Sequence, residues 1–165
     1  MSTLKSVSGR LEPIRGNDGV TAVVDYAHTP DALANVMQTL RDVLNGKGQL
    51  ITVCGCGGDR DAGKRPVMAQ EAVKASDKVI LTSDNPRTED PEAILDDMEA
   101  GLTDGQKRQV LRITDRRQAI RAAVAMAQKG DVILIAGKGH EDYQIIGTVK
   151  HHFDDREEVC AAFGI

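Results

Sequence analysis

The chain has 165 residues and a net charge of -4, with 41% apolar and 28% charged residues. This length fits one domain with a buried core. The acidic balance argues against a general affinity for nucleic acid or for anionic membranes, so any anion site must be a local group of Arg and Lys. No apolar run approaches the roughly 20 residues of a membrane span, and residues 1–7 lack the apolar stretch of a signal peptide. We therefore expect a cytoplasmic protein.

The three cysteines are too few for a disulfide framework, which agrees with a cytoplasmic location. Cys54 and Cys56 lie one residue apart, but a metal site needs more ligands, and neither a second pair nor a nearby His accompanies them. We expect no metal site in this chain.

Five short apolar runs are rich in β-branched residues and mostly lack alternation, which is typical of parallel strands buried on both faces. They are Val20–Val24, Leu50–Val53, Val79–Leu81, Val110–Ile113 and Val132–Ala136.

Segments between these runs have apolar residues at helical spacing, from Leu33 to Leu44, from Ile94 to Leu102 and from Ala119 to Ala127. Prolines at the first helical position mark three helix starts, at Pro30 after a capping Thr29, at Pro66 and at Pro91.

The tail differs from the rest of the chain. Gln144–Ile146 and Val149–Phe153 flank Gly147-Thr148 and predict a hairpin. Asp154 and Glu157 then form a possible capping box for a last helix.

The alternation of strands and helices predicts an α/β fold. We expect a Rossmann-like open, mostly parallel sheet with helices on both faces and an antiparallel edge hairpin. Ligands of such sheets bind beyond the carboxyl ends of the strands. Four segments rich in Gly, Asp, His or Arg follow strands and should meet at that edge: Asp25–Pro30, Gly55–Lys64, Ser83–Glu89 and Gly137–Tyr143.

The segment Gly58–Arg65 is one residue away from a nucleotide phosphate loop, because Arg65 stands where Ser or Thr should hold magnesium. A flexible anion-binding loop that uses Arg60, Lys64 and Arg65 near a helix start is a second interpretation. A glycine-rich loop with solvated charges is a third.

The segment Ser83–Glu89 contains Asp84-Asn85-Pro86-Arg87. Pro86 keeps Asn85 out of the helical conformation and so in a turn. Arg87 can hold a carboxylate with two parallel hydrogen bonds, and Asp84 can accept from an ammonium group. An amino-acid site and a simple turn with a surface Arg agree equally well with these residues.

The segments after the first and last strands also carry reactive side chains. Glu141 can bind an amine and Lys138 an anion, while His140 suits either acid–base chemistry or a structural hydrogen bond. Asp25 can accept from ribose hydroxyls or from local backbone. Arg10, taken alone, is a surface Arg.

Six strings in register carry a resemblance to the MurE family of ATP-dependent amide ligases. The chain resembles the C-terminal third of its members from about Ser8 to the end. The strings are Gly9–Glu12, Asp25–Asp31, Gly55–Asp61, Gly63–Pro66, Asp84–Arg87 and Gly137–Tyr143.

The resemblance implies a domain layout and residue roles. Residues 1–8 would be a linker remnant and residues 9–165 the amino-acid-binding domain, with the UDP-binding and central ATP-binding domains absent, so the isolated chain should not turn over. The ATP contacts would be Arg10, Asp25, Tyr26 and His28. The contacts to diaminopimelate would be Arg60, Asp84, Asn85, Arg87, Gly137 and Glu141. Further anion contacts are expected at Lys64, Lys138 and His140.

The activity implied is the addition of meso-diaminopimelate to UDP-N-acetylmuramoyl-L-alanyl-D-glutamate in peptidoglycan synthesis. ATP, with Mg²⁺ held mainly by the absent central domain, would convert the glutamate γ-carboxylate to an acyl phosphate, which the diaminopimelate amine attacks. Arg87 would pair with the second carboxylate of diaminopimelate, a group that lysine lacks. Ser83 departs from the family, which often has Asp there. A lysine-adding ligase and a stand-alone anion- or nucleotide-binding module are the alternatives.

Overall fold

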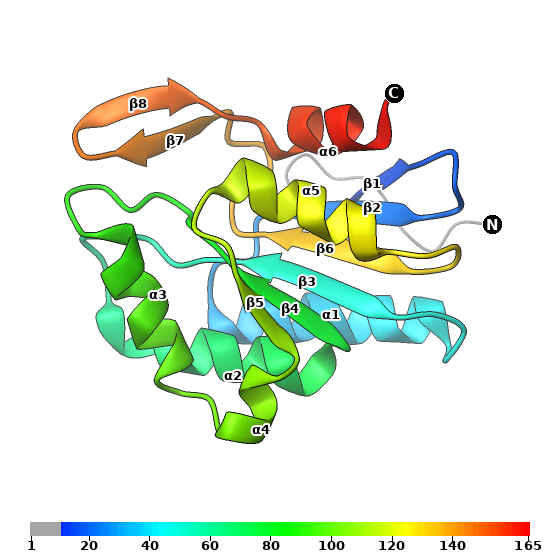
Figure 1. The fold of residues 1–165 in the computed structure, drawn as a ribbon, viewed down its shortest axis with the longest axis horizontal. Coiled ribbons are helices and arrows are strands. Elements are labelled where there is room, and N and C mark those ends of the chain that lie inside the picture. Colours follow the sequence, from blue (N-terminus) through cyan, green and yellow to red (C-terminus); the bar gives the residue numbers. More distant parts are fainter. Residues whose placement is uncertain (1–10) are drawn as a thin grey trace.

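A six-stranded sheet lies between two layers of helices in the computed structural model, which describes residues 11–165 (Figure 1). The strand order is β1-β2-β6-β3-β4-β5, and every neighbouring pair is parallel except β1 and β2. The strands are β1 (Glu12–Arg15), β2 (Thr21–Asp25), β3 (Leu50–Cys54), β4 (Lys78–Leu81), β5 (Val110–Arg112) and β6 (Val132–Ala136). The predicted mostly parallel α/β sheet is confirmed.

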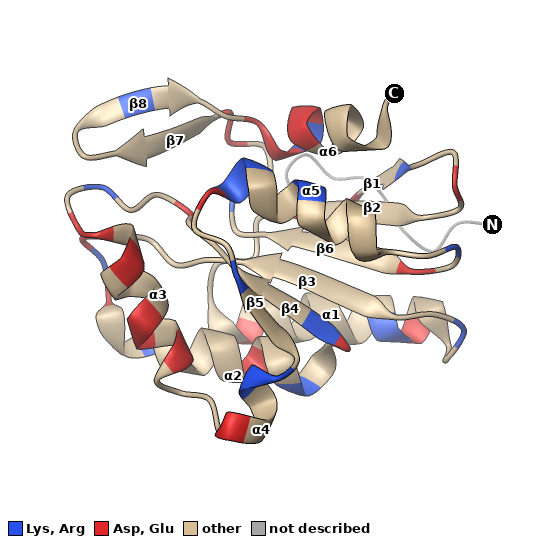
Figure 2. Ribbon diagram, in the orientation of Figure 1, with Lys and Arg blue, Asp and Glu red and all other residues tan. Residues whose placement is uncertain are grey.

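The helices cover both faces of the sheet, as expected. On one face lie α1 (Pro30–Leu44), α2 (Arg65–Ala75), α3 (Pro91–Glu99) and the short α4 (Asp104–Lys107), with a 3₁₀ turn, η1 (Ala62–Lys64), before α2. On the other face lie α5 (Arg116–Met126) and α6 (Asp155–Phe163). Figure 2 shows that charged residues lie mainly on the helices and loops, whereas β3 and β6 carry none.

Alternate residues of the central strand β6 face the two apolar cores. Leu134 packs in the core beneath α1 and α2, whereas Ile133 and Ile135 pack in the core beneath α5 and α6. All five residues of β6 are buried, which explains why its sequence is an unbroken apolar run.

The helix starts follow the sequence signals. Thr29 Oγ1 accepts a hydrogen bond from Ala32 N at the start of α1, and Pro30, Pro66 and Pro91 all lie in first turns. Asp154 caps α6 by accepting from Arg156 N. The capping box predicted there is only half formed, because the Glu157 carboxylate contacts His152 Nε2 at 2.7 Å instead.

The predicted hairpin consists of β7 (Tyr143–Ile146) and β8 (Val149–His152). It forms a separate two-stranded sheet, and the antiparallel edge strand of the main sheet is β1 at the other end of the chain. Residues 137–142 carry the chain away from β6, so the hairpin lies over the carboxyl ends of the strands (Figure 1). None of the helices in the described part of the chain is long and apolar enough to cross a membrane.

Candidate functional site

A polar cavity of about 460 Å³ lies at the carboxyl edge of the sheet. All four segments that follow the strands contribute to it, as the topology predicted. Its lining residues are Tyr26, His28, Gly55, Cys56, Gly57, Arg60, Lys64, Asp84, Asn85, Arg87, Gly137, Glu141 and Tyr143. The cavity therefore brings together all six residues expected to contact an amino acid.

Glycines allow the loop after β3 to approach the turn after β4. A Cβ atom on Gly55 would lie 2.3 Å from Thr82 O, and one on Gly58 would lie 1.8 Å from Pro86 O. Gly58 N donates to Asn85 O at 2.8 Å across this contact. Only glycine fits at these two positions, so the two loops form one wall of the cavity.

The hairpin holds the Asp84–Arg87 turn from the other side. Arg87 N donates to Ile145 O at 3.0 Å, and Gly147 N donates to Arg87 O at 2.7 Å. Asn85 Oδ1 accepts from Ile145 N at 3.0 Å. These bonds keep Arg87 in the left-handed conformation, with φ of 54°, that a non-glycine residue rarely adopts.

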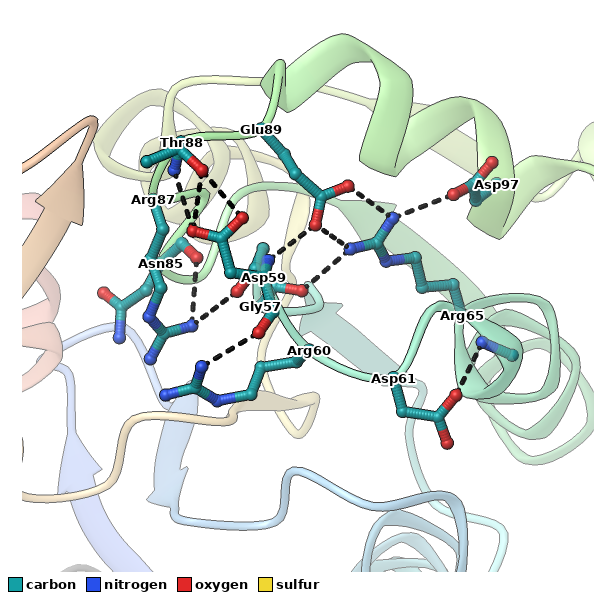
Figure 3. Close-up of polar contacts among 12 residues, drawn as sticks. Gly57, Asp59, Arg60, Asp61, Arg65, Asn85, Arg87, Thr88, Glu89 and Asp97 are labelled. Carbon is teal, nitrogen blue, oxygen red and sulfur yellow. Dashed lines mark hydrogen bonds and ion pairs between the residues drawn. The ribbon is translucent and has the colours of Figure 1, made fainter.

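Two guanidinium groups lie on the same side of this wall (Figure 3). Arg87 Nη1 donates to Gly58 O at 2.9 Å, and Arg60 Nη1 donates to Asp59 O at 2.9 Å. Neither Nε nor Nη2 of either arginine has a hydrogen bond to the described residues. Each arginine therefore keeps one edge with two donors, which is the geometry that a carboxylate accepts.

Two carboxylates face these cations across the cavity. Asp84 Oδ1 is buried and lacks a hydrogen bond to the described residues, although it lies 3.3 Å from Lys138 Nζ. Burial raises the pKa of Glu141 and the Asp84 charge adds to this, whereas Lys138 and the Tyr143 hydroxyl oppose it. Asp84 thus lies beside one ammonium group of the protein, and two carboxylates at one cavity suit a further ammonium group from a ligand.

Lys138 is fully buried beneath the cavity. Its Nζ donates to Asn85 Oδ1 and to Tyr143 O, both at 2.8 Å. Burial lowers the pKa of Lys138, and the Asp84 charge opposes that shift. Lys138 thus supports the cavity floor from within, which corrects its expected place as an anion contact, since its ammonium group faces internal acceptors.

Arg65 is also buried, at 1% exposure, and the structure corrects the anion-binding interpretation for this residue. Figure 3 shows its guanidinium bonded to Glu89 and Asp97, apart from the guanidinium groups of Arg60 and Arg87. It donates to both Glu89 oxygens, at 3.1 and 2.7 Å, to Asp97 Oδ2 at 2.9 Å and to Gly57 O at 3.1 Å.

Four N–H groups of Gly58–Arg65 are not free to hold a phosphate. They donate to acceptors of the protein: Gly58 N to Asn85 O, Asp59 N to Glu89 Oε2, Gly63 N to Asp61 Oδ1 and Arg65 N to Ala62 O. In residues 11–165 no group of three or more His, Cys, Asp or Glu is placed to hold a metal ion. The side chain at position 65 offers no magnesium ligand either.

An ion pair beneath the cavity, which the sequence interpretation did not identify, joins α5 to α6. Arg116 and Asp155 are both fully buried and form two hydrogen bonds, at 2.8 and 2.7 Å. Burial alone would lower the pKa of Arg116, but Asp155 keeps it above its ordinary value. Arg116 also donates to Ser83 O and to Ala136 O, both at 3.1 Å, and so ties the ends of β4 and β6 together.

Tyr143 lines the cavity, although the sequence interpretation gave it no role. The nearby Glu141 charge raises the pKa of its hydroxyl, and its ring lies 5.7 Å from Lys138 Nζ. The only signal in the sequence is its place at the end of the string Gly137–Tyr143.

A second hollow of about 330 Å³ lies between the loop after β2 and α1. It is lined by Leu11, Asp25, Tyr26, Ala27, His28, Ala32, Asn35 and Val36. The Asp25 oxygens accept from Leu11 N and from Ala27 N, both at 2.8 Å. In this structure Asp25 therefore binds local backbone, the alternative to ribose hydroxyls that the sequence left open. His140 is exposed, with its ring 6.1 Å from that of Tyr26. Arg10 and the linker at residues 1–8 lie outside the described residues.

Open α/β sheets bind their ligands beyond the carboxyl ends of the strands, and many of these ligands are nucleotides. The sequence model of the Mur ligase, glutamate ligase domain, matches residues 9–139, and the chain belongs to this family.

Particular relatives narrow this class. The chain is 63% identical over 163 residues to a protein of Parabacteroides distasonis named UDP-N-acetylmuramoyl-L-alanyl-D-glutamate--2,6-diaminopimelate ligase. The alignment covers 99% of the chain and 34% of that protein. A solved structure with the same name is 52% identical, with a TM-score of 0.88 over 98% of the chain and 32% of the solved protein. The chain thus spans about a third of the length of these relatives.

A more distant solved structure shares the fold alone. It is the bifunctional folylpolyglutamate synthase/dihydrofolate synthase of Yersinia pestis, complexed with AMPPNP and Mn ion, at 19% identity and a TM-score of 0.59 over 97% of the chain and 32% of that protein.

Proposed function

We propose that this chain holds the incoming meso-diaminopimelate in a ligase that joins it to UDP-N-acetylmuramoyl-L-alanyl-D-glutamate, a peptidoglycan precursor. The observation that carries the proposal is the charge pattern of the cavity. Two arginines whose Nε and Nη2 make no hydrogen bond to the described residues line the cavity together with two carboxylates, Asp84 and Glu141. Asp84 also lies 3.3 Å from the buried Lys138 Nζ. Diaminopimelate carries two carboxylates and two ammonium groups, so its charges can pair with these arginines and carboxylates.

Arg87 and Arg60 hold the carboxylates of the amino acid in this proposal. Both line the cavity, and Nε and Nη2 of each make no hydrogen bond to the described residues, so each can form two parallel hydrogen bonds. Lysine lacks the second carboxylate, and one guanidinium would then lose water without gaining a partner. The same cavity would therefore bind lysine less tightly than diaminopimelate.

Asp84 and Glu141 hold the ammonium groups and orient the amine that reacts. The amine must lose its proton before it attacks the acyl phosphate, and phosphate then leaves as the amide bond forms. Held in place, the amine attacks within one complex, which is the main source of rate enhancement that positioning gives.

ATP supplies the phosphoryl group that activates the glutamate carboxylate. In the proposal its contacts on this chain are Tyr26, His28 and Asp25, which line the second hollow, and Arg10. The described residues do not fit a magnesium site, so the metal would be bound elsewhere in a longer protein. The expectation that the isolated chain does not turn over stays a prediction.

Titrations of the ¹⁵N-labelled chain with meso-diaminopimelate and with L-lysine test the proposal. We expect meso-diaminopimelate to bind about tenfold more tightly, since a charge-assisted pair contributes on the order of 1.5–3 kcal/mol. Arg87→Ala should abolish this preference, whereas Arg108→Ala, an exposed arginine at the opposite edge, should keep it. Equal affinities in the unmodified chain, or a preference for lysine, would overturn the proposal and favour the lysine-adding alternative.

The nucleotide-binding alternative predicts tight ATP binding through Gly58–Arg65. Because four of the loop amides donate to protein acceptors, and because Lys64 Nζ already donates to His28 O at 3.0 Å, we expect no saturable ATP binding there. Saturable binding of ATP that Lys64→Ala removes would support the alternative.

A further inference from the structure

The loop that carries Arg60 and the turn that carries Arg87 are joined by side chains outside the cavity (Figure 3). The Asp59 carboxylate accepts from Thr88 Oγ1 at 2.7 and 2.8 Å and from Thr88 N at 3.2 Å. Thr88 is exposed and does not line the cavity. These bonds connect residues 59 and 88, which are direct neighbours of the two arginines.

Glu89 and Arg65 form a second connection between the same segments. Glu89 Oε2 accepts from Asp59 N at 2.6 Å and from Arg65 Nη2 at 2.7 Å. Arg65 Nη2 also donates to Gly57 O, so the guanidinium bridges the start of the loop and the end of the turn. Asp97 of α3 holds Arg65 Nη1 at 2.9 Å and fixes this bridge to a helix.

Both segments hold a non-glycine residue in the left-handed conformation. The φ angle is 55° at Asp59 and 54° at Arg87. Such angles are unfavourable for residues with a Cβ atom and persist where surrounding bonds hold them. A peptide rotation at either residue would swing a guanidinium away from the cavity, because Arg60 follows Asp59 directly and Arg87 is itself in this conformation.

We infer that Asp59, Thr88, Glu89 and Arg65 form a loop clamp that fixes the spacing of the Arg60 and Arg87 guanidinium groups, and that this spacing selects an amino acid with two carboxylates. The inference rests on the proposed function and extends it to four positioning residues that need not touch the ligand. A loosened clamp would cost affinity for a ligand that binds both arginines at once. It would cost little for a ligand with one carboxylate.

Two pairs of variants separate the clamp from general stability. Thr88→Val removes the hydroxyl and Thr88→Ser keeps it. Asp59→Gly keeps the left-handed backbone without the tether, and Asp59→Asn keeps an acceptor oxygen. Thr39→Val is the matched control, because Thr39 is exposed on α1 and, among the described residues, its hydroxyl donates only to Asn35 O at 3.0 Å.

The dissociation constants for meso-diaminopimelate and L-lysine are measured by NMR titration for each variant. We expect Thr88→Val and Asp59→Gly to weaken meso-diaminopimelate binding about five- to tenfold, as the loss of a hydrogen bond to a charged group implies. Lysine binding should change by less than about twofold on the same reasoning. Thr88→Ser, Asp59→Asn and Thr39→Val should retain most of the preference.

The outcomes distinguish the two proposals. If the unmodified chain prefers meso-diaminopimelate and Thr88→Val and Asp59→Gly keep that ratio, the clamp is wrong and the proposed function stands. An equal loss for both ligands would show a merely structural role and also overturn the clamp. If the unmodified chain shows no preference, the proposed function fails. NMR relaxation of the Arg60 and Arg87 Nε–H groups then tests the clamp. The clamp predicts that both guanidinium groups are more mobile in Thr88→Val than in Thr88→Ser, and equal mobility in the two variants would overturn it.

Discussion

Two cavities of similar size lie at opposite ends of the strands, about 460 Å³ at the carboxyl edge and about 430 Å³ at the amino edge. The amino-edge cavity is lined by the first residues of β4 and β5 and by Met126. Its Asp77 carboxylate accepts from Arg41 Nη1 and from Leu50 N, both at 2.9 Å, and the Gln109 amide donates to Ser76 O at 3.2 Å. Those polar groups already have partners within the protein.

At the carboxyl edge several polar atoms make no hydrogen bond to the described residues. They are Asp84 Oδ1, which is buried 3.3 Å from Lys138 Nζ, and the Nε and Nη2 atoms of Arg60 and Arg87. The difference shows that size does not distinguish a binding site from a surface hollow here. The hydrogen bonds that its polar groups still lack distinguish the binding site, and the buried side chains of Lys138 and Arg116 support those groups.

The largest difference in unfolding free energy should come from the ion pairs at the carboxyl and amino ends of the strands. Arg116→Leu leaves Asp155 buried and unpaired, so we expect a loss of about 3–5 kcal/mol in unfolding free energy, measured with urea. Arg41→Leu breaks the partly exposed pair with Asp77 at the amino end and should cost about 1 kcal/mol or less. Adding Asp155→Leu to Arg116→Leu should recover much of the loss. Equal losses at the two ends would contradict the comparison.

Glycine substitutions should give a smaller contrast. Gly58→Ala places a Cβ atom 1.8 Å from Pro86 O, which forces the loop and the turn apart and should cost about 1–3 kcal/mol. The same variant should weaken meso-diaminopimelate binding. Gly105→Ala has its nearest neighbour at 4.0 Å and lies in α4, so it should be neutral or slightly stabilising. Normal diaminopimelate affinity in Gly58→Ala would show that the close approach is not needed for the site.

The pH dependence of meso-diaminopimelate binding tests whether ionised Glu141 contributes to the affinity. Burial raises the pKa of Glu141 above its ordinary value of 4.5, so this group loses its charge at a higher pH than an exposed Glu as the solution is acidified. We expect meso-diaminopimelate affinity to fall with pH through a midpoint above 4.5. Titrations at several pH values measure it, and Glu141→Gln should lower the affinity and remove that midpoint. A midpoint that survives in Glu141→Gln would assign it to another group.

The smallest effect is expected at the amino-edge cavity. Leu111 is 46% exposed at its rim, and Leu111→Lys should change the unfolding free energy by no more than about 0.5 kcal/mol. Binding of meso-diaminopimelate should stay unchanged. A change in its affinity would show that the two edges are coupled.

The sequence predicted the parts of the fold that local patterns determine. The run Val132–Ala136 indicated a strand buried on both faces, and first-turn prolines such as Pro30 and Pro91 marked helix starts. Parallel topology then placed the polar segments at one edge, which is why the expected amino-acid contacts line one cavity. The contacts of these residues with a ligand stay a prediction.

The sequence could not predict the roles of three charged residues. Arg65, Arg116 and Lys138 are among the largest fully buried side chains, although such residues are ordinarily exposed. Their partners lie far along the chain, with Arg65 bound 24 and 32 positions away, Arg116 39 positions away and Lys138 53 positions away. Local patterns do not encode such pairings. The sequence near Arg65 therefore indicates an anion contact, because it does not reveal that Glu89 and Asp97 bind the guanidinium.

The position of β6 has a consequence for how the chain folds. β6 lies in the middle of the sheet between β2 and β3, yet it follows every other strand of that sheet in the sequence. Until residues 132–136 emerge from the ribosome, β2 and β3 each expose an unpaired apolar edge, and the sheet remains two separate halves. Folding of the whole sheet therefore waits for one late strand, and a nascent chain stalled before Asp131 should depend on chaperones to avoid edge-to-edge aggregation.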